Sequence, residues 1–237
     1  MEPNESAEEI QEYLLEHQNE FLPQIIQFDE LLHRYESAIK EVSTKLEILK
    51  SDLKLHNKRD CVSSIQSRIK SPVSILNKLK RKGIPLNMDS IKNELNDVAG
   101  IRVVCSFIDD IYMLAEKLGS QDDIVVVAVK DYIKNPKPNG YRSFHMIVEV
   151  PVFFSEAKEN VRVEIQIRTV AMDFWASLEH DIKYKKEIAG CSGIVEELKG
   201  CADIIAETDR HMMELRDKIK TLPHDNPSPE ETEERRK

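Results

Sequence analysis

Residues 161–168 read Val161-Arg162-Val163-Glu164-Ile165-Gln166-Ile167-Arg168, so apolar and polar side chains alternate without a break. Successive side chains of a β-strand point to opposite faces, and alternate residues lie roughly 6.6 Å apart. The stretch therefore predicts a strand with one aliphatic face and one face that presents a carboxylate, an amide and two guanidinium groups. The solvated face of a half-covered sheet shows the same pattern, so periodicity alone does not assign a function to it.

Elements of both kinds surround this strand. Further short runs rich in β-branched residues occupy 101–107, 124–129 and 144–152, with helical patterns between some of them. Apolar residues recur at helical spacing over 7–55, where Pro23 predicts a break between two helices, and again over 170–222. The tail from Pro223, rich in Pro, Glu and Arg, is predicted to be disordered. We therefore expect an α/β (α+β) fold with helical extensions at both ends, which pack on the sheet domain or on another subunit.

Composition excludes several classes of protein. The chain has 237 residues, 41% apolar and 32% charged, as soluble globular domains do. No apolar run approaches the roughly 18 residues of a membrane span. The acidic start has no feature of a signal peptide, so we expect a cytoplasmic protein. The four cysteines form no CxxC pair and are interpreted as small apolar residues or incidental thiols.

The net charge of −9 is concentrated at the N-terminus. Residues 1–30 contain nine acidic side chains and no Lys or Arg, whereas residues 31–237 are balanced at 34 against 34. An acidic total therefore does not exclude an anionic ligand, because local basic clusters decide that question.

A second candidate carboxylate is Asp97, which precedes the apolar run 98–105 at the end of a predicted helix. Alone, it would be an ordinary turn aspartate. Two carboxylates at adjoining strand ends, Asp97 and Glu164, could instead hold Mg²⁺, which proteins usually bind through one or two carboxylates plus substrate phosphates.

Phosphates need cations, and the segment 68–82 supplies them. Lys70, Ser74 and Lys78 follow one another at four-residue intervals after Arg68. If Pro72 opens a helix, Ser74 and Lys78 share one face of it, with Lys70 just ahead of the first turn. A lysine-rich solvated helix would look the same, so this segment gains meaning only from its context.

The loop 135–145 contains two prolines and an Asn-Gly pair just before a predicted strand. These residues stiffen a turn and hold Tyr141 between Lys137 and Arg142, an arrangement suited to a stacked purine beside a phosphate. An ordinary hairpin turn with a surface tyrosine is the alternative. The chain has no GxxxxGK[ST] and no GxGxxG motif, which sets P-loop and Rossmann sites aside.

Four motifs follow one another in order: Arg68-x-Lys70-x3-Ser74-x3-Lys78, Asp97-Val-Ala-Gly-Ile-Arg102, Pro136-Lys-Pro-Asn-Gly-Tyr141-Arg-Ser-Phe-His145 and Val163-Glu-Ile-Gln-Ile-Arg-Thr169. Together they resemble the synthetase domain of the RelA/SpoT family, over about residues 61–185. The flanking helices resemble those of small alarmone synthetases of the RelP type. The resemblance implies a mixed sheet of about five strands flanked by helices, similar to nucleotidyltransferases.

The resemblance also implies a reaction, in which pyrophosphate passes from ATP to the 3′-hydroxyl of GDP or GTP to give ppGpp or pppGpp and AMP. By motif match, the residues expected to bind ATP are Arg68, Lys70, Ser74, Lys78 and Arg102. Asp97 and Glu164 would be catalytic and bind Mg²⁺, and Tyr141 would stack on guanine. The other residues expected at the GDP or GTP site are Lys130, Lys137, Asn139, His145, Gln166, Arg168 and Ala176.

Domain boundaries follow from the same match. We expect N-terminal helices over 1–60, the synthetase domain over 61–187, C-terminal helices over 188–222 and a disordered tail over 223–237. About 60 residues precede the synthetase segment, so no hydrolase activity is expected. The resemblance implies a homo-oligomer, specifically a tetramer, with no membrane or nucleic acid required.

Two other functions stay open on the sequence. A related enzyme could place pyrophosphate on the 3′ end of tRNA or on adenine nucleotides, since its donor site would look the same. A non-enzymatic helical interaction protein would explain the amphipathic ends but not the polar strand face or the stiffened loop.

Overall fold

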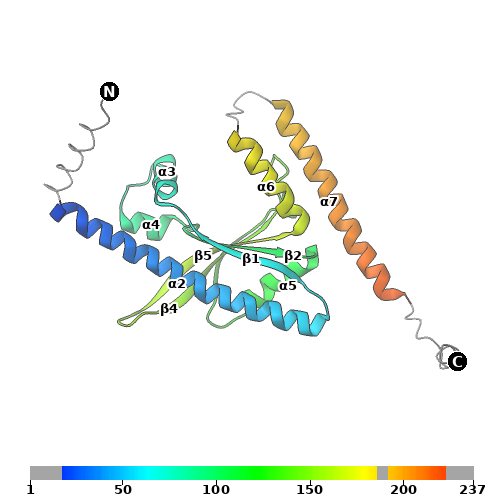
Figure 1. The fold of residues 1–237 in the computed structure, drawn as a ribbon, viewed down its shortest axis with the longest axis horizontal. Helices are drawn as coiled ribbons and strands as arrows, with labels where there is room; N and C mark the ends of the chain where they lie inside the picture. The colour runs from blue at the N-terminus through cyan, green and yellow to red at the C-terminus, as the bar shows by residue number, and fades with distance from the viewer. Residues whose placement is uncertain (1–17, 186–191, 223–237) are drawn as a thin grey trace, which may run out of the picture.

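A computed structural model of the chain describes residues 18–185 and 192–222, and its centre is a five-stranded mixed sheet (Figure 1). The strands are β1 (Val62–Ile69), β2 (Ala99–Cys105), β3 (Val125–Asp131), β4 (Phe144–Phe153) and β5 (Lys158–Thr169), in the spatial order β1-β2-β5-β4-β3. β2 and β5 run parallel, and the other neighbouring pairs are antiparallel. The expected mixed sheet with flanking helices is confirmed.

The alternating stretch lies in β5, the middle strand, and its two faces differ as predicted. Val163, Ile165 and Ile167 are fully buried, whereas Arg162, Glu164 and Gln166 keep partial exposure. Arg168 departs from the pattern because its polar side chain is only 4% exposed. The polar face of β5 is therefore not an ordinary solvated surface.

Two helices cover the apolar face of the sheet. α2 (Gln18–Asn57) and α5 (Ile108–Gly119) both contact β2, β4 and β5 (Figure 1). α2 contributes the face predicted from helical spacing, with Tyr35, Val42 and Leu46 among its buried residues. The helix thus packs on its own domain, which was one of the two expected roles.

The predicted break at Pro23 is wrong, because α2 runs as one helix from Gln18 through Asn57. Proline removes one backbone N–H from the helix ladder. Pro23 lies within the first two turns of a 40-residue helix, and packing of the following turns stabilises the helix despite that loss. The predicted helical stretch from residue 7 and the tail from residue 223 lie outside the described residues.

Two short helices flank the polar face. α3 (Pro72–Lys82) begins at Pro72 as predicted, with the Ser71 hydroxyl accepting a hydrogen bond from the Ser74 N–H. It ends at Gly83, whose φ of 66° suits a left-handed cap. α4 (Met88–Glu94) follows and leads through Leu95 to Asp97 and β2.

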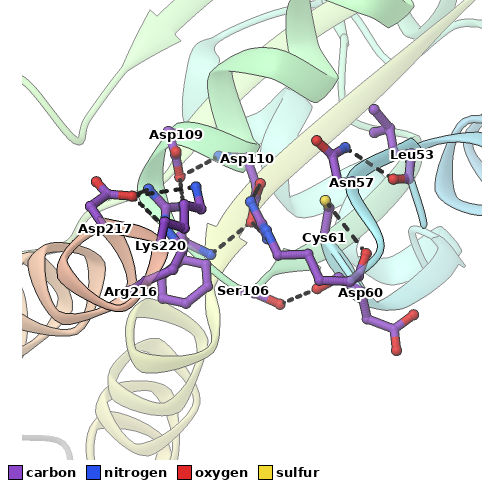
Figure 2. A network of polar contacts seen from close by, with 12 residues as sticks. Leu53, Asn57, Asp60, Cys61, Ser106, Asp109, Asp110, Arg216, Asp217 and Lys220 are labelled. Atoms are coloured by element: carbon purple, nitrogen blue, oxygen red, sulfur yellow. Dashed lines mark hydrogen bonds and ion pairs between the residues drawn. The ribbon is translucent and has the colours of Figure 1, made fainter. Parts of the chain in front are cut away.

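α6 (Val170–Lys185) and α7 (Ser192–Thr221) pack side by side (Figure 1). The Trp175 indole N–H of α6 donates to the Leu198 carbonyl of α7, at 2.9 Å. The far half of α7 is held by an ion pair between Arg216 and Asp109 of α5, 2.8 Å apart. Arg216 also pairs with Asp217 of its own helix (Figure 2). Together with Arg59, which pairs with Asp110, Arg216 also lies against the Phe107 ring. α7 is thus fixed to the domain at both halves.

Edge strand β1 was not predicted. Most of its residues between Val62 and Ile69 are polar, and half are exposed, so no alternating apolar pattern marks it. Pairing with β2 makes it a strand. The other four predicted strands are confirmed with small shifts of their ends.

The structure also shows where three of the four cysteines lie and whether any helix could span a membrane. Cys61 and Cys105 are free and buried, as expected of small apolar residues, and Cys201 is free and exposed; Cys191 lies outside the described residues. Over 18–185 and 192–222, no helix combines the length and apolar content needed to cross a membrane.

Candidate active site

A row of polar residues crosses the sheet on one face. Side chains paired directly across strands lie on the same face, and the strand register pairs Gln66 with Arg102, Arg102 with Gln166, Gln166 with His145, and His145 with Lys130. Glu164 lies two residues before Gln166 on the same face of β5. Residues far apart in sequence are thus brought into one surface.

Two hollows open above this face. The first, of about 220 Å³, lies over β1, β2 and β5. The second, of about 680 Å³, is an open depression bordered by the sheet, by loop residues Lys137, Asn139 and Tyr141, and by α6. Both hollows are lined by the same five residues: Arg68, Asp97, Arg102, Glu164 and Gln166. The two candidate carboxylates therefore lie where the hollows meet.

Asp97 is tied to the basic segment. The Nζ atoms of Lys70 and Lys78 each lie 2.6 Å from Asp97 Oδ2. Burial alone would raise the pKa of Asp97, but the hydrogen bonds and charges of the two lysines outweigh it, so the pKa lies below its usual value. The second oxygen, Oδ1, is buried and finds no hydrogen-bond partner among the described residues.

Glu164 has a different environment. Its Oε2 accepts a hydrogen bond from the Gln166 amide at 2.9 Å, and its Oε1 lies 3.5 Å from His145 Nδ1. Burial acts to raise the pKa of Glu164, yet the hydrogen bonds from His145 and Gln166 outweigh burial and the nearby charge of Asp97, so the pKa is lowered. Both carboxylates are therefore ionised at neutral pH.

A chain of hydrogen bonds continues from Glu164 into the second hollow. The Tyr141 hydroxyl lies 2.9 Å from His145 Nε2, and Arg168 donates to it at 2.7 Å. Arg168 also donates to Asp173 at 3.0 Å and to Gln166 at 2.9 Å. The buried guanidinium thus holds Tyr141 in one orientation at the wall of the hollow.

α6 and α7 hold the loop that carries Tyr141. The Asn139 amide donates to Glu179 of α6 at 3.0 Å, and Arg142 donates to Asp203 of α7 at 3.0 Å. Gly140 has a φ of 87°, and a Cβ added there would lie 2.6 Å from the Ala202 Cβ. Only glycine fits this close approach.

The structure brings most predicted site residues together. The hollows are lined by Arg68, Asp97, Arg102, Lys137, Asn139, Tyr141, His145, Glu164, Gln166, Arg168 and Ala176. Lys70 and Lys78 reach the site through Asp97. Ser74 is exposed on α3 and its hydroxyl accepts from Ser71. Lys130 is exposed on β3 and lines neither hollow, although it shares the sheet face of His145.

Sequence reasoning missed several lining or contacting residues. Gln66 and Ser67 line the first hollow but belong to the unpredicted strand β1; the period-two spacing of Gln66 and Arg68 was the available signal. Asp173, which pairs with both Arg168 and Arg102, lies on a helix and carries no local signal of its role.

The carboxylates fit a Mg²⁺ ion. The unpartnered, buried Oδ1 of Asp97 is an oxygen of the type that hard cations prefer, and ionised Glu164 lines the same hollows. Within 18–185 and 192–222, no group of three or more His, Cys, Asp or Glu converges as a complete metal centre. Mg²⁺ typically takes its remaining ligands from water and substrate phosphates.

Known proteins are similar to this chain in sequence. The sequence model of a family described as "Region found in RelA / SpoT proteins" matches residues 67–189. The GTP pyrophosphokinase YwaC of Bacillus subtilis is 43% identical over 185 residues, covering 78% of this chain and 88% of YwaC.

Solved structures of small alarmone synthetases have a similar fold. Small alarmone synthetase 1 of Bacillus subtilis bound to its product pppGpp is similar at a TM-score of 0.75 and 34% identity, covering 81% of this chain and 98% of that one. The same enzyme bound to AMPCPP is similar at a TM-score of 0.69 and 30% identity, covering 83% of this chain and 99% of that one. This chain belongs to the RelA/SpoT family.

Proposed function

We propose that this protein is a GTP pyrophosphokinase that makes ppGpp or pppGpp. The 3′-oxygen of GDP or GTP attacks the β-phosphorus of ATP, the bond between that phosphorus and the oxygen of the α-phosphate breaks, and AMP leaves. The observation that carries the proposal is the pair of adjoining hollows that share Asp97 and Glu164, because a transfer between two nucleotides needs two sites that meet at the reacting atoms. A relative is named for this activity, and a similar structure holds pppGpp.

The first hollow suits the donor. Arg68 and Arg102 line it, and Lys70 and Lys78 lie at its edge on Asp97, so four cations would face the triphosphate of ATP. Ser74 lies in the first turn of α3, where a phosphate oxygen would also meet the helix N-terminus. A similar structure binds AMPCPP, an ATP analogue.

The second hollow suits the acceptor. Tyr141, held by Arg168 and His145, would stack on guanine. Gln166, Asn139 and Ala176 line the same space and would contact the base or the ribose. Lys137 would approach the phosphates of the acceptor, and so would Lys130 of β3.

Asp97 and Glu164 would hold Mg²⁺, which when bound neutralises charge on the transferring phosphates. Glu164 would also accept the 3′-hydroxyl proton, since its carboxylate is ionised and faces both hollows. Positioning and charge neutralisation supply most of the acceleration in phosphoryl transfer, so the ring of Lys and Arg matters as much as the base.

We further infer the domain division given by the sequence, with residues 61–187 as the synthetase domain, and a homo-oligomer, specifically a tetramer. α7 supports an oligomer, because Ile204, Met212, Leu215 and Ile219 are at least half exposed on this helix and exposed apolar surface of this extent is typical of interfaces. A cytoplasmic location remains part of this proposal, since ATP and GTP are available there.

The decisive experiment is incubation of purified protein with ATP, Mg²⁺ and, separately, GDP, GTP, adenine nucleotides and tRNA, with products resolved by chromatography. We expect ppGpp or pppGpp and an equal amount of AMP. Modified tRNA or adenine nucleotides without 3′-pyrophosphorylated guanosine would overturn the proposal in favour of the related transferases.

A further inference from the structure

The ammonium group of Lys137 lies close to the rings of two tyrosines, Tyr132 and Tyr141. Its Nζ is 4.6 Å from the centroid of the Tyr141 ring and 4.7 Å from that of Tyr132. The two ring centroids are 6.0 Å apart and the rings are inclined at 66°. A cation within about 6 Å of an aromatic face is attracted by the ring's electron density. The ammonium group of an otherwise exposed lysine is therefore held from two directions.

Tyr132 is itself firmly placed. Its backbone N–H donates to the Ser143 carbonyl at 3.0 Å, which continues the pairing of β3 with β4 beyond Asp131. The Asp131 carboxylate accepts from the backbone of Ile133 and Lys134, each at 3.0 Å, and so shapes the turn that follows. The Tyr132 ring meets His145 edge-on, with centroids 5.2 Å apart.

A lysine on a solvated loop samples many rotamers, and ordering it at the moment of binding weakens affinity. We propose that Tyr132 is a positioning residue for the acceptor nucleotide: together with Tyr141 it holds the Lys137 ammonium at the mouth of the second hollow before the nucleotide arrives. The inference rests on the proposed function and adds to it a residue that lines neither hollow.

The test is a double-mutant cycle on Tyr132 and Lys137. Tyr132→Leu should raise the KM for GDP or GTP by about three- to ten-fold and leave the KM for ATP and kcat nearly unchanged. Tyr132→Phe should match the wild type, because the ring is kept and the described part of the chain offers the hydroxyl no hydrogen bond. In a Lys137→Met background, Tyr132→Leu should have no further effect.

A second variant, which changes only the electron density of the ring, keeps the test decisive if Tyr132→Leu does not fold. 4-Cyanophenylalanine at position 132 keeps the packing but withdraws electron density from the ring face, so it should raise the same KM while the melting temperature stays that of the wild type. Additive effects of Tyr132→Leu and Lys137→Met, or an unchanged KM in the cyano variant, would overturn the inference. Wild-type protein that makes no 3′-pyrophosphorylated guanosine would instead defeat the proposed function.

Discussion

The Thr169 hydroxyl group links β5, α6 and α7 through two hydrogen bonds, and its removal should lower the free energy of unfolding. Thr169 is fully buried; its Oγ1 donates to Asp209 of α7 at 2.5 Å and accepts from the Met172 N–H at 3.1 Å, which caps α6. Thr169→Val keeps the shape and removes both bonds. A buried acceptor left without its donor costs about 1–3 kcal/mol, and a lost N-cap costs about 1 kcal/mol.

The sum, roughly 2–4 kcal/mol of unfolding free energy, corresponds to a melting temperature lower by roughly 4–16 °C for a chain of this size. Urea denaturation followed by circular dichroism measures it directly. Thr169→Ser, which keeps the hydroxyl, should lose only about 1 kcal/mol, from its missing methyl group. A Thr169→Val protein within about 0.5 kcal/mol of the wild type would refute the reasoning.

The acceptor of this hydrogen bond, Asp209, predicts how stability changes with pH. Burial raises the pKa of Asp209 and the Thr169 hydrogen bond only partly opposes it. A raised folded-state pKa means that the contribution of Asp209 to stability is fully present below its unfolded pKa and is lost as the pH rises through its folded pKa. Asp209→Asn should therefore be at least as stable as the wild type at pH 7, with a smaller advantage near pH 4. A larger advantage at pH 4 would contradict this account.

Three further predictions concern the site and the assembly. Asp97→Ala and Glu164→Ala should each abolish synthesis of 3′-pyrophosphorylated guanosine while circular dichroism spectra stay unchanged; turnover retained by either would remove it from the catalytic pair. Because the pKa values of Asp97 and Glu164 both lie below their usual values, neither carboxylate should titrate between pH 6 and 8; a carboxyl NMR signal of either residue that titrates in that range would show its pKa to be raised instead. Leu215→Glu on the exposed apolar face of α7 should lower the mass measured by light scattering, whereas Arg210→Glu, at an exposed position on another face of the helix, should not; equal masses for Leu215→Glu and the wild type would place the interface elsewhere.

Several features of this protein were readable from local sequence. The unbroken alternation of 161–168 predicts a strand with a polar face because side-chain direction on a strand depends only on position. Pro72 marks the start of α3 for a similarly local reason, since its fixed φ suits the first helical residue. The basic motif, Asp97 and the loop around Tyr141 could be named because each is a short run of residues.

Other features depend on contacts between distant residues, and sequence periodicity carries no trace of them. Strand β1 exists because it pairs with β2, and Pro23 stays inside α2 because the rest of that helix packs on the sheet. The meeting of Asp97 with Glu164 depends on the parallel register of β2 and β5. The strand, its polar face and the chemical groups of the site were therefore predictable from short runs of residues. That two hollows share the carboxylates, and that Tyr132 and Tyr141 lie beside Lys137, became visible in the folded chain alone, because strand pairing and loop closure, not local propensity, set those distances.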